Sequence, residues 1–176
     1  QQFDPSHARC RPFYQKLADV GLPLLCHVGP EAAIPPFERP FQEPNHPRLL
    51  RNALEAGGTV IAAHAALPIL PPPLESDQDY RELVALFREG ETRGWKLYAD
   101  LSAINLGPRM GYIERVKADI PGDRLIFGSD YPIPILDISQ RRLVYLDDVY
   151  GNKITTLMAN PGHIARLVQR PHLLIC

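Results

Sequence analysis

Four short, nearly continuous apolar runs constrain the fold of this chain more than any other feature of its sequence. They are residues 22–28 (LPLLCHV), 59–64 (TVIAAH), 96–101 (KLYADL) and 124–127 (RLIF). Runs of this length that are apolar throughout are typical of strands buried on both faces of a parallel sheet. Parallel strands need crossover connections, which are usually helices. The runs therefore predict an α/β fold.

Amphipathic segments lie between the apolar runs and predict the crossover helices. Their apolar residues recur at helical spacing over residues 9–20, 47–56, 77–88 and 109–118, and the third segment is expected to stop at Gly90. Alternating β and α elements predict parallel strands with right-handed crossovers. The pattern fits either a doubly wound sheet or part of a (β/α)8 barrel, because a complete barrel typically needs about 250 residues.

The chain is long enough for one domain with its own core, which we expect to span residues 1–176, with a C-terminal helical tail over residues 136–176. It begins at Gln1 and its first methionine is Met110. We therefore expect an upstream segment to be missing from this sequence.

Charge and cysteine content narrow the possible partners. The net charge is −1, which predicts neither a nucleic acid nor a membrane partner, and no apolar run reaches transmembrane length. The three cysteines form no C-x-x-C pair, so neither a disulfide framework nor a thiolate zinc site is favoured. We expect a cytoplasmic protein.

Polar residues fall at the ends of the predicted strands. His27 and His64 lie at the ends of the first two, Asp100 and Ser102 close the third, and Asp130 follows the fourth. Active sites of barrels and open α/β sheets form at the carboxyl ends of strands. Neutral imidazole and carboxylate are natural ligands for Zn, Fe or Mn. A single strand-end histidine is more often structural, but several at equivalent positions favour a metal site.

Two further residues are candidate substrate contacts, in addition to Ser102. Arg39 lies in the long proline-rich loop after His27, where it could bind a substrate carboxylate, and Glu31 lies at the start of the same loop. A solvated surface arginine is the plainer interpretation of Arg39. Long loops without secondary structure are often functional, which keeps both residues as candidates.

The strings LPLLCHVGPE, TVIAAHAA, LYADLSA and RLIFGSDYPIP resemble consecutive elements of the amidohydrolase-related branch of the amidohydrolase superfamily. That branch contains metal-dependent hydrolases, lactonases and decarboxylases on a (β/α)8 barrel. The core of the resemblance is residues 1–135. It implies a TIM-barrel type fold of which this chain is the C-terminal half, with strands 5 to 8 and their helices, and from which the N-terminal half is missing.

The resemblance also implies roles for individual residues. His27 matches the metal ligand of strand 5, and His64 matches a strand 6 histidine that is a ligand or a catalytic group. Asp130 matches the strand 8 aspartate, which binds metal, accepts a proton from water, or does both. Ser102 and Asp100 match a segment that borders the site. The family's H-x-H of strand 1, which supplies two metal ligands, does not occur in this sequence.

Three functions remain open on these observations. The first is a metal-dependent hydrolase that uses a divalent metal, with Zn expected and Fe or Mn as alternatives, to cleave an amide, ester or lactone bond of a small molecule. The second is a non-oxidative decarboxylase of an aromatic or unsaturated carboxylate on the same scaffold. The third is an inactive half-barrel, or one that is active only with a second copy or an N-terminal half, because open sheet edges favour association.

Overall fold

The computed structural model describes residues 4–30, 45–70, 73–104, 109, 111–128 and 130, and the backbone of 135–137 and 142–144. Its centre is a four-stranded parallel sheet in the order β1-β2-β3-β4. The strands are β1 (Leu24–His27), β2 (Thr59–Ala63), β3 (Lys96–Asp100) and β4 (Leu125–Ile126). All four predicted strands are confirmed, although β4 is only two residues long.

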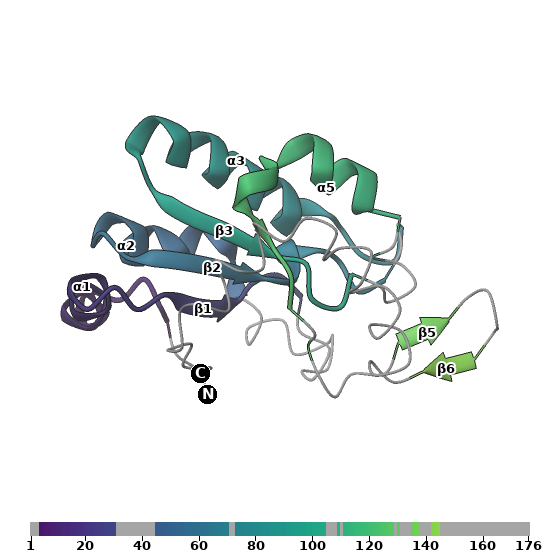
Figure 1. The fold of residues 1–176 in the computed structure, drawn as a ribbon, viewed down its shortest axis with the longest axis horizontal. Coiled ribbons are helices and arrows are strands. Elements are labelled where there is room, and N and C mark those ends of the chain that lie inside the picture. The colour runs from purple at the N-terminus through teal and green to yellow at the C-terminus, as the bar shows by residue number, and fades with distance from the viewer. Residues whose placement is uncertain are drawn as a thin grey trace.

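Helices connect successive strands. Residues before β1 form η1 (Ala8–Cys10) and α1 (Arg11–Asp19), and the three crossovers carry η4 (Pro47–Leu50) with α2 (Arg51–Glu55), η5 (His64–Ala66) with α3 (Gln78–Arg93), and α5 (Ile113–Asp119) with η6 (Gly122–Arg124). The order of the strands in the sheet follows their order in the chain. When every crossover in such a sheet is right-handed, all the crossover helices lie on the same side of the sheet. Figure 1 shows α2, α3 and α5 on that side. This mixed α/β arrangement is compatible with part of a TIM-barrel-like fold.

Two helix boundaries differ from the sequence prediction. The helix α3 does not stop at Gly90, because this glycine lies against Trp95 and the helix continues until Gly94, whose φ of 67° ends it. The helix α5 begins at Ile113, four residues later than the start of the predicted segment.

The core lies between the sheet and these helices. Val60, Ala62 and Ala99 on the central strands are fully buried, and so are Tyr80 and Leu83 on the facing side of α3. The strand β1, in contrast, is only partly buried along its whole length. The continuous apolar composition of β2 therefore corresponds to burial on both faces, as predicted. The strand β1, in contrast, is partly exposed, and within the described part of the chain it pairs with β2 alone.

The expected C-terminal helical tail is wrong where the structure describes it. Strands β5 (Ile135–Asp137) and β6 (Arg142–Val144) pair in antiparallel fashion as a separate two-stranded sheet (Figure 1). Such a pairing depends on hydrogen bonds between two segments of the chain. A segment of three residues is too short for its own sequence to indicate a strand. Residues 145–176 lie outside the described residues. Among the described helices, none combines the length and the apolar character needed to cross a membrane.

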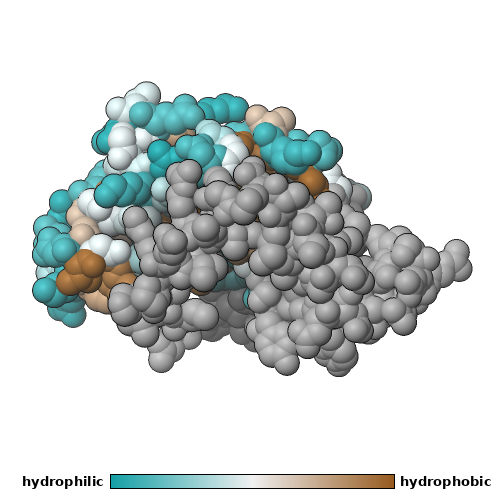
Figure 2. Space-filling view, viewed as in Figure 1, coloured by the Kyte–Doolittle hydropathy of each residue, from teal (hydrophilic) through white to brown (hydrophobic). Residues whose placement is uncertain are grey.

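The outer face of the helical layer is mostly hydrophilic. Figure 2 shows polar residues over α3 and α5, and an apolar patch over α1. The exposed large apolar side chains in that region are Phe13, which is 50% exposed, and Val20, which is 58% exposed.

Asp77, at the N-terminus of α3, connects this helix to α5 by ion pairs. Its carboxylate lies 2.6 Å from Nη1 of Arg115 and 3.0 Å from Nη1 of Arg81. The hydrogen bond from Arg115 is the main reason that the pKa of Asp77 is lowered from its ordinary value. The ionised carboxylate therefore stabilises the folded state above the pKa of the unfolded chain, and this contribution is lost as the pH falls through the lower folded-state pKa.

We expect Asp77→Asn to lower the free energy of unfolding at pH 7 by about 0.5 to 1 kcal/mol, because exposed ion pairs contribute about this much. The difference between wild type and variant should narrow below about pH 4, where Asp77 begins to protonate in the unfolded chain. Urea denaturation at pH 7 and pH 3 measures both. Asp123→Asn is the matched control, since that carboxylate is 76% exposed and 4.0 Å from Arg124. An equal loss in both variants at pH 7 would contradict the assignment.

Candidate active site at the carboxyl ends of the strands

The parallel sheet brings the predicted site residues to one edge. His27 is the last residue of β1 and pairs in register with Ala63, the last residue of β2, which His64 follows. Asp100 is the last residue of β3, and Asp130 follows β4. Carboxyl ends of neighbouring parallel strands meet at the same edge of a sheet. The expectation that these residues share one edge is therefore met.

The two histidines lie against each other at this edge. The ring centroids of His27 and His64 are 5.1 Å apart, with an angle of 61° between the ring planes. Nε2 of His27 is 3.2 Å from the carbonyl oxygen of Pro30. Because a carbonyl oxygen only accepts hydrogen bonds, this contact is a hydrogen bond when Nε2 of His27 carries the proton.

Three oxygen atoms lie near one nitrogen of the His64 ring. Its Nδ1 is 2.9 Å from Oγ of Ser102, 3.3 Å from the carbonyl oxygen of Ser102 and 3.9 Å from Oδ2 of Asp130. The side chain of His64 is 12% exposed and that of Asp130 is 29% exposed. The imidazole of His64, which follows β2, thus lies next to residues that follow β3 and β4.

Asp100 lies beneath this cluster and is 6% exposed. Its Oδ1 accepts a hydrogen bond of 3.0 Å from the backbone N–H of Ser102, and its Oδ2 accepts a close one from Oγ of the same residue. Burial raises the pKa of Asp100, the negative charge of Asp130 acts in the same direction, and the hydrogen bonds from Ser102 oppose the rise. A Cβ atom at Gly128 would lie 2.6 Å from Oδ1 of Asp100, so a side chain at this position would displace the Asp100 carboxylate.

The backbone at this edge is strained in a way that the sequence analysis did not anticipate. All five non-glycine residues with positive φ among the described residues follow strand ends at the site. They are His64 (58°), Ala65 (50°), Ala66 (52°), Ala103 (56°) and Asp130 (54°). Left-handed conformations of non-glycine residues cost energy and gather at functional sites. The small side chains after His64 (Ala65-Ala66) are the one sequence signal that fits this turn.

Two of the predicted substrate contacts cannot be placed. Glu31 and Arg39 lie outside the described residues. Ser102 belongs to the cluster, but it is only 4% exposed and its hydroxyl group contacts Asp100 and His64. Its role as a substrate contact stays a prediction, and its position gives it a second role that is argued below.

The donor atoms at this edge are of the right kind for a divalent metal. A metal about 2.1 Å from one nitrogen of each of two imidazoles, at a tetrahedral angle, would place the ring centroids roughly 5 Å apart. The separation between His27 and His64 is 5.1 Å. Within the described ranges, however, no three His, Cys, Asp or Glu side chains already converge on one point that could hold a metal. The assignment of His27, His64 and Asp130 as ligands therefore stays a prediction.

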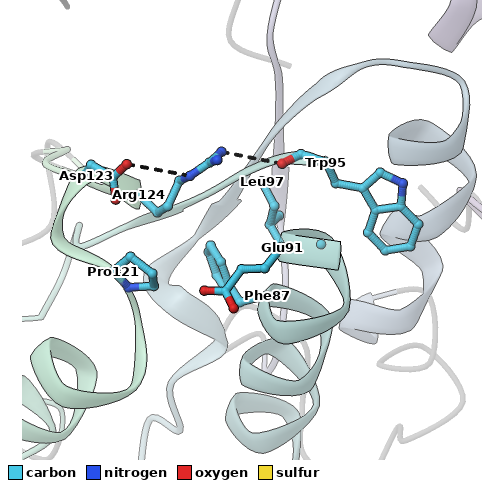
Figure 3. A pocket seen from close by; sticks show the side chains of 8 residues that line it. Phe87, Glu91, Trp95, Leu97, Pro121, Asp123 and Arg124 are labelled. Carbon is cyan, nitrogen blue, oxygen red and sulfur yellow. Dashed lines mark hydrogen bonds and ion pairs between the residues drawn. The ribbon is translucent and has the colours of Figure 1, made fainter. Parts of the chain in front are cut away.

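A cavity of about 240 Å³ lies at the opposite ends of the strands. Figure 3 shows Arg124, just before β4, reaching the carbonyl oxygen of Trp95, just before β3, with Phe87 and Glu91 of α3 beside them. Residues at the amino ends of barrel strands serve stability, whereas the chemistry occurs at the carboxyl ends. This cavity is therefore a packing feature, and the histidine edge is the candidate site.

Comparison with known proteins identifies the family of the chain. The family model described as amidohydrolase matches residues 1–157, and the chain belongs to this family. This family is one of metal-dependent hydrolases and decarboxylases. No solved structure matches the chain.

The curated relatives carry a different name. The chain is 30% identical to an alanine dehydrogenase of Bacillus subtilis over 138 residues, which are 74% of this chain and 36% of that protein. It is 46% identical to one of Methanococcus maripaludis over 52 residues, 30% of this chain and 14% of that protein. It thus spans about a third or less of these relatives. No two glycines in its sequence lie two positions apart, as the dinucleotide-binding fingerprint G-x-G-x-x-G requires.

Proposed function

We propose that this chain forms part of a metal-dependent hydrolase that cleaves an amide, ester or lactone bond of a small molecule. His27, His64 and Asp130 would hold the divalent metal, with Zn the first choice and Fe or Mn as alternatives. The observation that carries the proposal is the meeting of two imidazoles and a carboxylate at one strand edge, with ring centroids 5.1 Å apart and Nδ1 of His64 3.9 Å from Oδ2 of Asp130.

The residues at this edge suit hydrolysis. When bound, a divalent metal supplies water whose pKa is lowered towards about 7. Asp130, which is 29% exposed, would accept the proton of the attacking water and pass it to the leaving group. His27 and His64 would hold the metal next to that carboxylate. The buried Asp100 would remain a structural acceptor beneath His64, because Ser102 occupies both of its oxygen atoms.

We also propose that β1 to β4 correspond to strands 5 to 8 of a (β/α)8 barrel, so that the chain is its C-terminal half. The order of strand-end residues, with His27 first, His64 second and Asp130 last, supports this assignment. The exposed apolar surface near α1 and the partly buried strand β1 lie where a preceding strand and helix would pack. The partner of the half-barrel would then be an N-terminal half or a second copy.

We expect His27→Ala to lower the affinity for Zn by at least about 100-fold. Removing a residue that only hydrogen-bonds to a metal ligand already lowers metal affinity by up to about 100-fold, and removing the ligand itself should lower it at least as much. Titration of the metal-free protein with Zn in a calorimeter measures the affinity. His7→Ala is the control, because His7 is exposed and its ring accepts a local hydrogen bond from the backbone N–H of Arg9. Hydrolysis of chromogenic esters, lactones and anilides is then measured with and without Zn. Equal Zn affinity of His27→Ala and His7→Ala would refute the ligand assignment.

A further inference from the structure

His64 has two possible roles in such a site, and they require opposite tautomers of the neutral imidazole. As a metal ligand or base through Nε2, it must carry its proton on Nδ1. As a hydrogen-bond donor to a carbonyl through Nε2, it must carry the proton there instead. The atoms that surround Nδ1 of His64 decide between these two states.

The hydroxyl group of Ser102 is oriented by Asp100. Oγ of Ser102 donates its single proton to Oδ2 of Asp100, and the backbone N–H of Ser102 donates to Oδ1 at 3.0 Å. The carboxylate of Asp100 is buried, and the absence of a side chain at Gly128 leaves room for it. With its proton committed to Asp100, the hydroxyl group of Ser102 presents only lone pairs to Nδ1 of His64, which is 2.9 Å away.

Two more acceptors face the same nitrogen of His64. The carbonyl oxygen of Ser102 is 3.3 Å from Nδ1, and a carbonyl oxygen never donates. Oδ2 of Asp130 is 3.9 Å away, and its negative charge attracts a proton on Nδ1. These three neighbours, all from the described part of the chain, therefore favour a proton on Nδ1.

We propose that Asp100 and Ser102 are positioning residues that hold His64 with its proton on Nδ1 and its lone pair on Nε2. His64 is then a metal ligand or base through Nε2, and not a neutral donor to the substrate carbonyl. The tautomer follows from the geometry alone, whereas its consequence for metal binding rests on the proposed function. It also explains why Ser102 is buried, since a residue that acts through His64 needs no contact with the substrate.

The test is nitrogen NMR of the histidine rings in the metal-free protein, at a pH where the imidazoles are neutral. Two-bond and three-bond correlations identify the protonated nitrogen of each ring, and loss of one signal set in His64→Gln assigns His64. We expect the proton of His64 on Nδ1 in the wild type. A proton on Nε2 would overturn the proposal.

Asp100→Asn is the most informative variant, because it preserves shape but reverses a hydrogen bond. The backbone N–H of Ser102 keeps the amide oxygen facing it, so the amide nitrogen faces Oγ and donates to it. The hydroxyl proton of Ser102 then turns towards Nδ1 of His64. We expect the ratio of Nδ1–H to Nε2–H tautomers to fall by about tenfold, since one hydrogen bond changes direction. An unchanged ratio would overturn the proposal.

Ser102→Ala and Ser102→Thr provide a rescue test. The alanine variant removes the hydroxyl acceptor and should also lower the tautomer ratio, whereas threonine retains the hydroxyl group and should restore it. Equal ratios in the two variants would contradict the role of the hydroxyl group. Zn titration of Asp100→Asn separates this inference from the proposed function. If the Nε2–H tautomer became the dominant form in Asp100→Asn, unchanged Zn affinity would support the positioning role and refute His64 as a ligand.

Discussion

Replacing Asp130 by asparagine is expected to lower Zn-dependent hydrolysis by about 10²- to 10⁴-fold, the usual contribution of a positioned proton acceptor. The amide has nearly the size of the carboxylate, but it carries no negative charge and does not accept a proton from water. Asparagine also tolerates the left-handed backbone at this position, where φ is 54°. The loss should therefore come from chemistry and not from misfolding.

The measurement is kcat at saturating Zn on the chromogenic substrate that the wild type hydrolyses fastest. Asp123→Asn is the matched control, because Asp123 is 76% exposed and lies at the amino ends of the strands. Thermal unfolding of both variants checks that the fold is intact. If Asp130→Asn retained kcat within a factor of two, Asp130 would not be the proton acceptor.

The strands were predictable because burial leaves a direct trace in the sequence. A strand such as β2, covered on both faces, must be apolar throughout, and residues 59–63 show this without any three-dimensional information. The hairpin of β5 and β6 was not predictable in the same way. Its residues meet across the ladder, as Leu136 meets Leu143, and a three-residue strand has too few positions to show a period.

The proximity of the candidate site residues was predictable, but the contacts between them were not. His27, His64 and Asp130 stand at strand ends, and parallel pairing alone brings strand ends together. The link from Asp100 through Ser102 to Nδ1 of His64 depends on a turn after β3 and on the left-handed residues after β2. Such links are set by distances between segments far apart in the chain, and residue types do not report them.

Gly29→Ala is expected to have the largest effect on stability, because it combines two costs. The φ of Gly29 is 86°, where any side chain is strained by about 1 to 2 kcal/mol. A Cβ atom there would also lie 2.9 Å from Cα of Ala66, and 3.0 Å from its carbonyl carbon and oxygen. These are backbone atoms of η5, which cannot turn aside as a side chain does. Adding about 1 to 3 kcal/mol for overpacking, we expect a total loss of roughly 2 to 5 kcal/mol.

Two other glycines separate these costs. Gly21 and Gly94 have φ values of 68° and 67°, and no atom lies within 4 Å of a Cβ built on either. Gly21→Ala and Gly94→Ala should therefore show only the conformational cost of about 1 to 2 kcal/mol in urea denaturation. An equal loss in all three variants would mean that Gly29 does not contact Ala66. A larger loss at Gly29 would show that this backbone contact holds the end of β1 against η5, where His27 meets His64. The same variant should then weaken Zn binding even at temperatures where it remains folded, because the two imidazoles would be pushed apart.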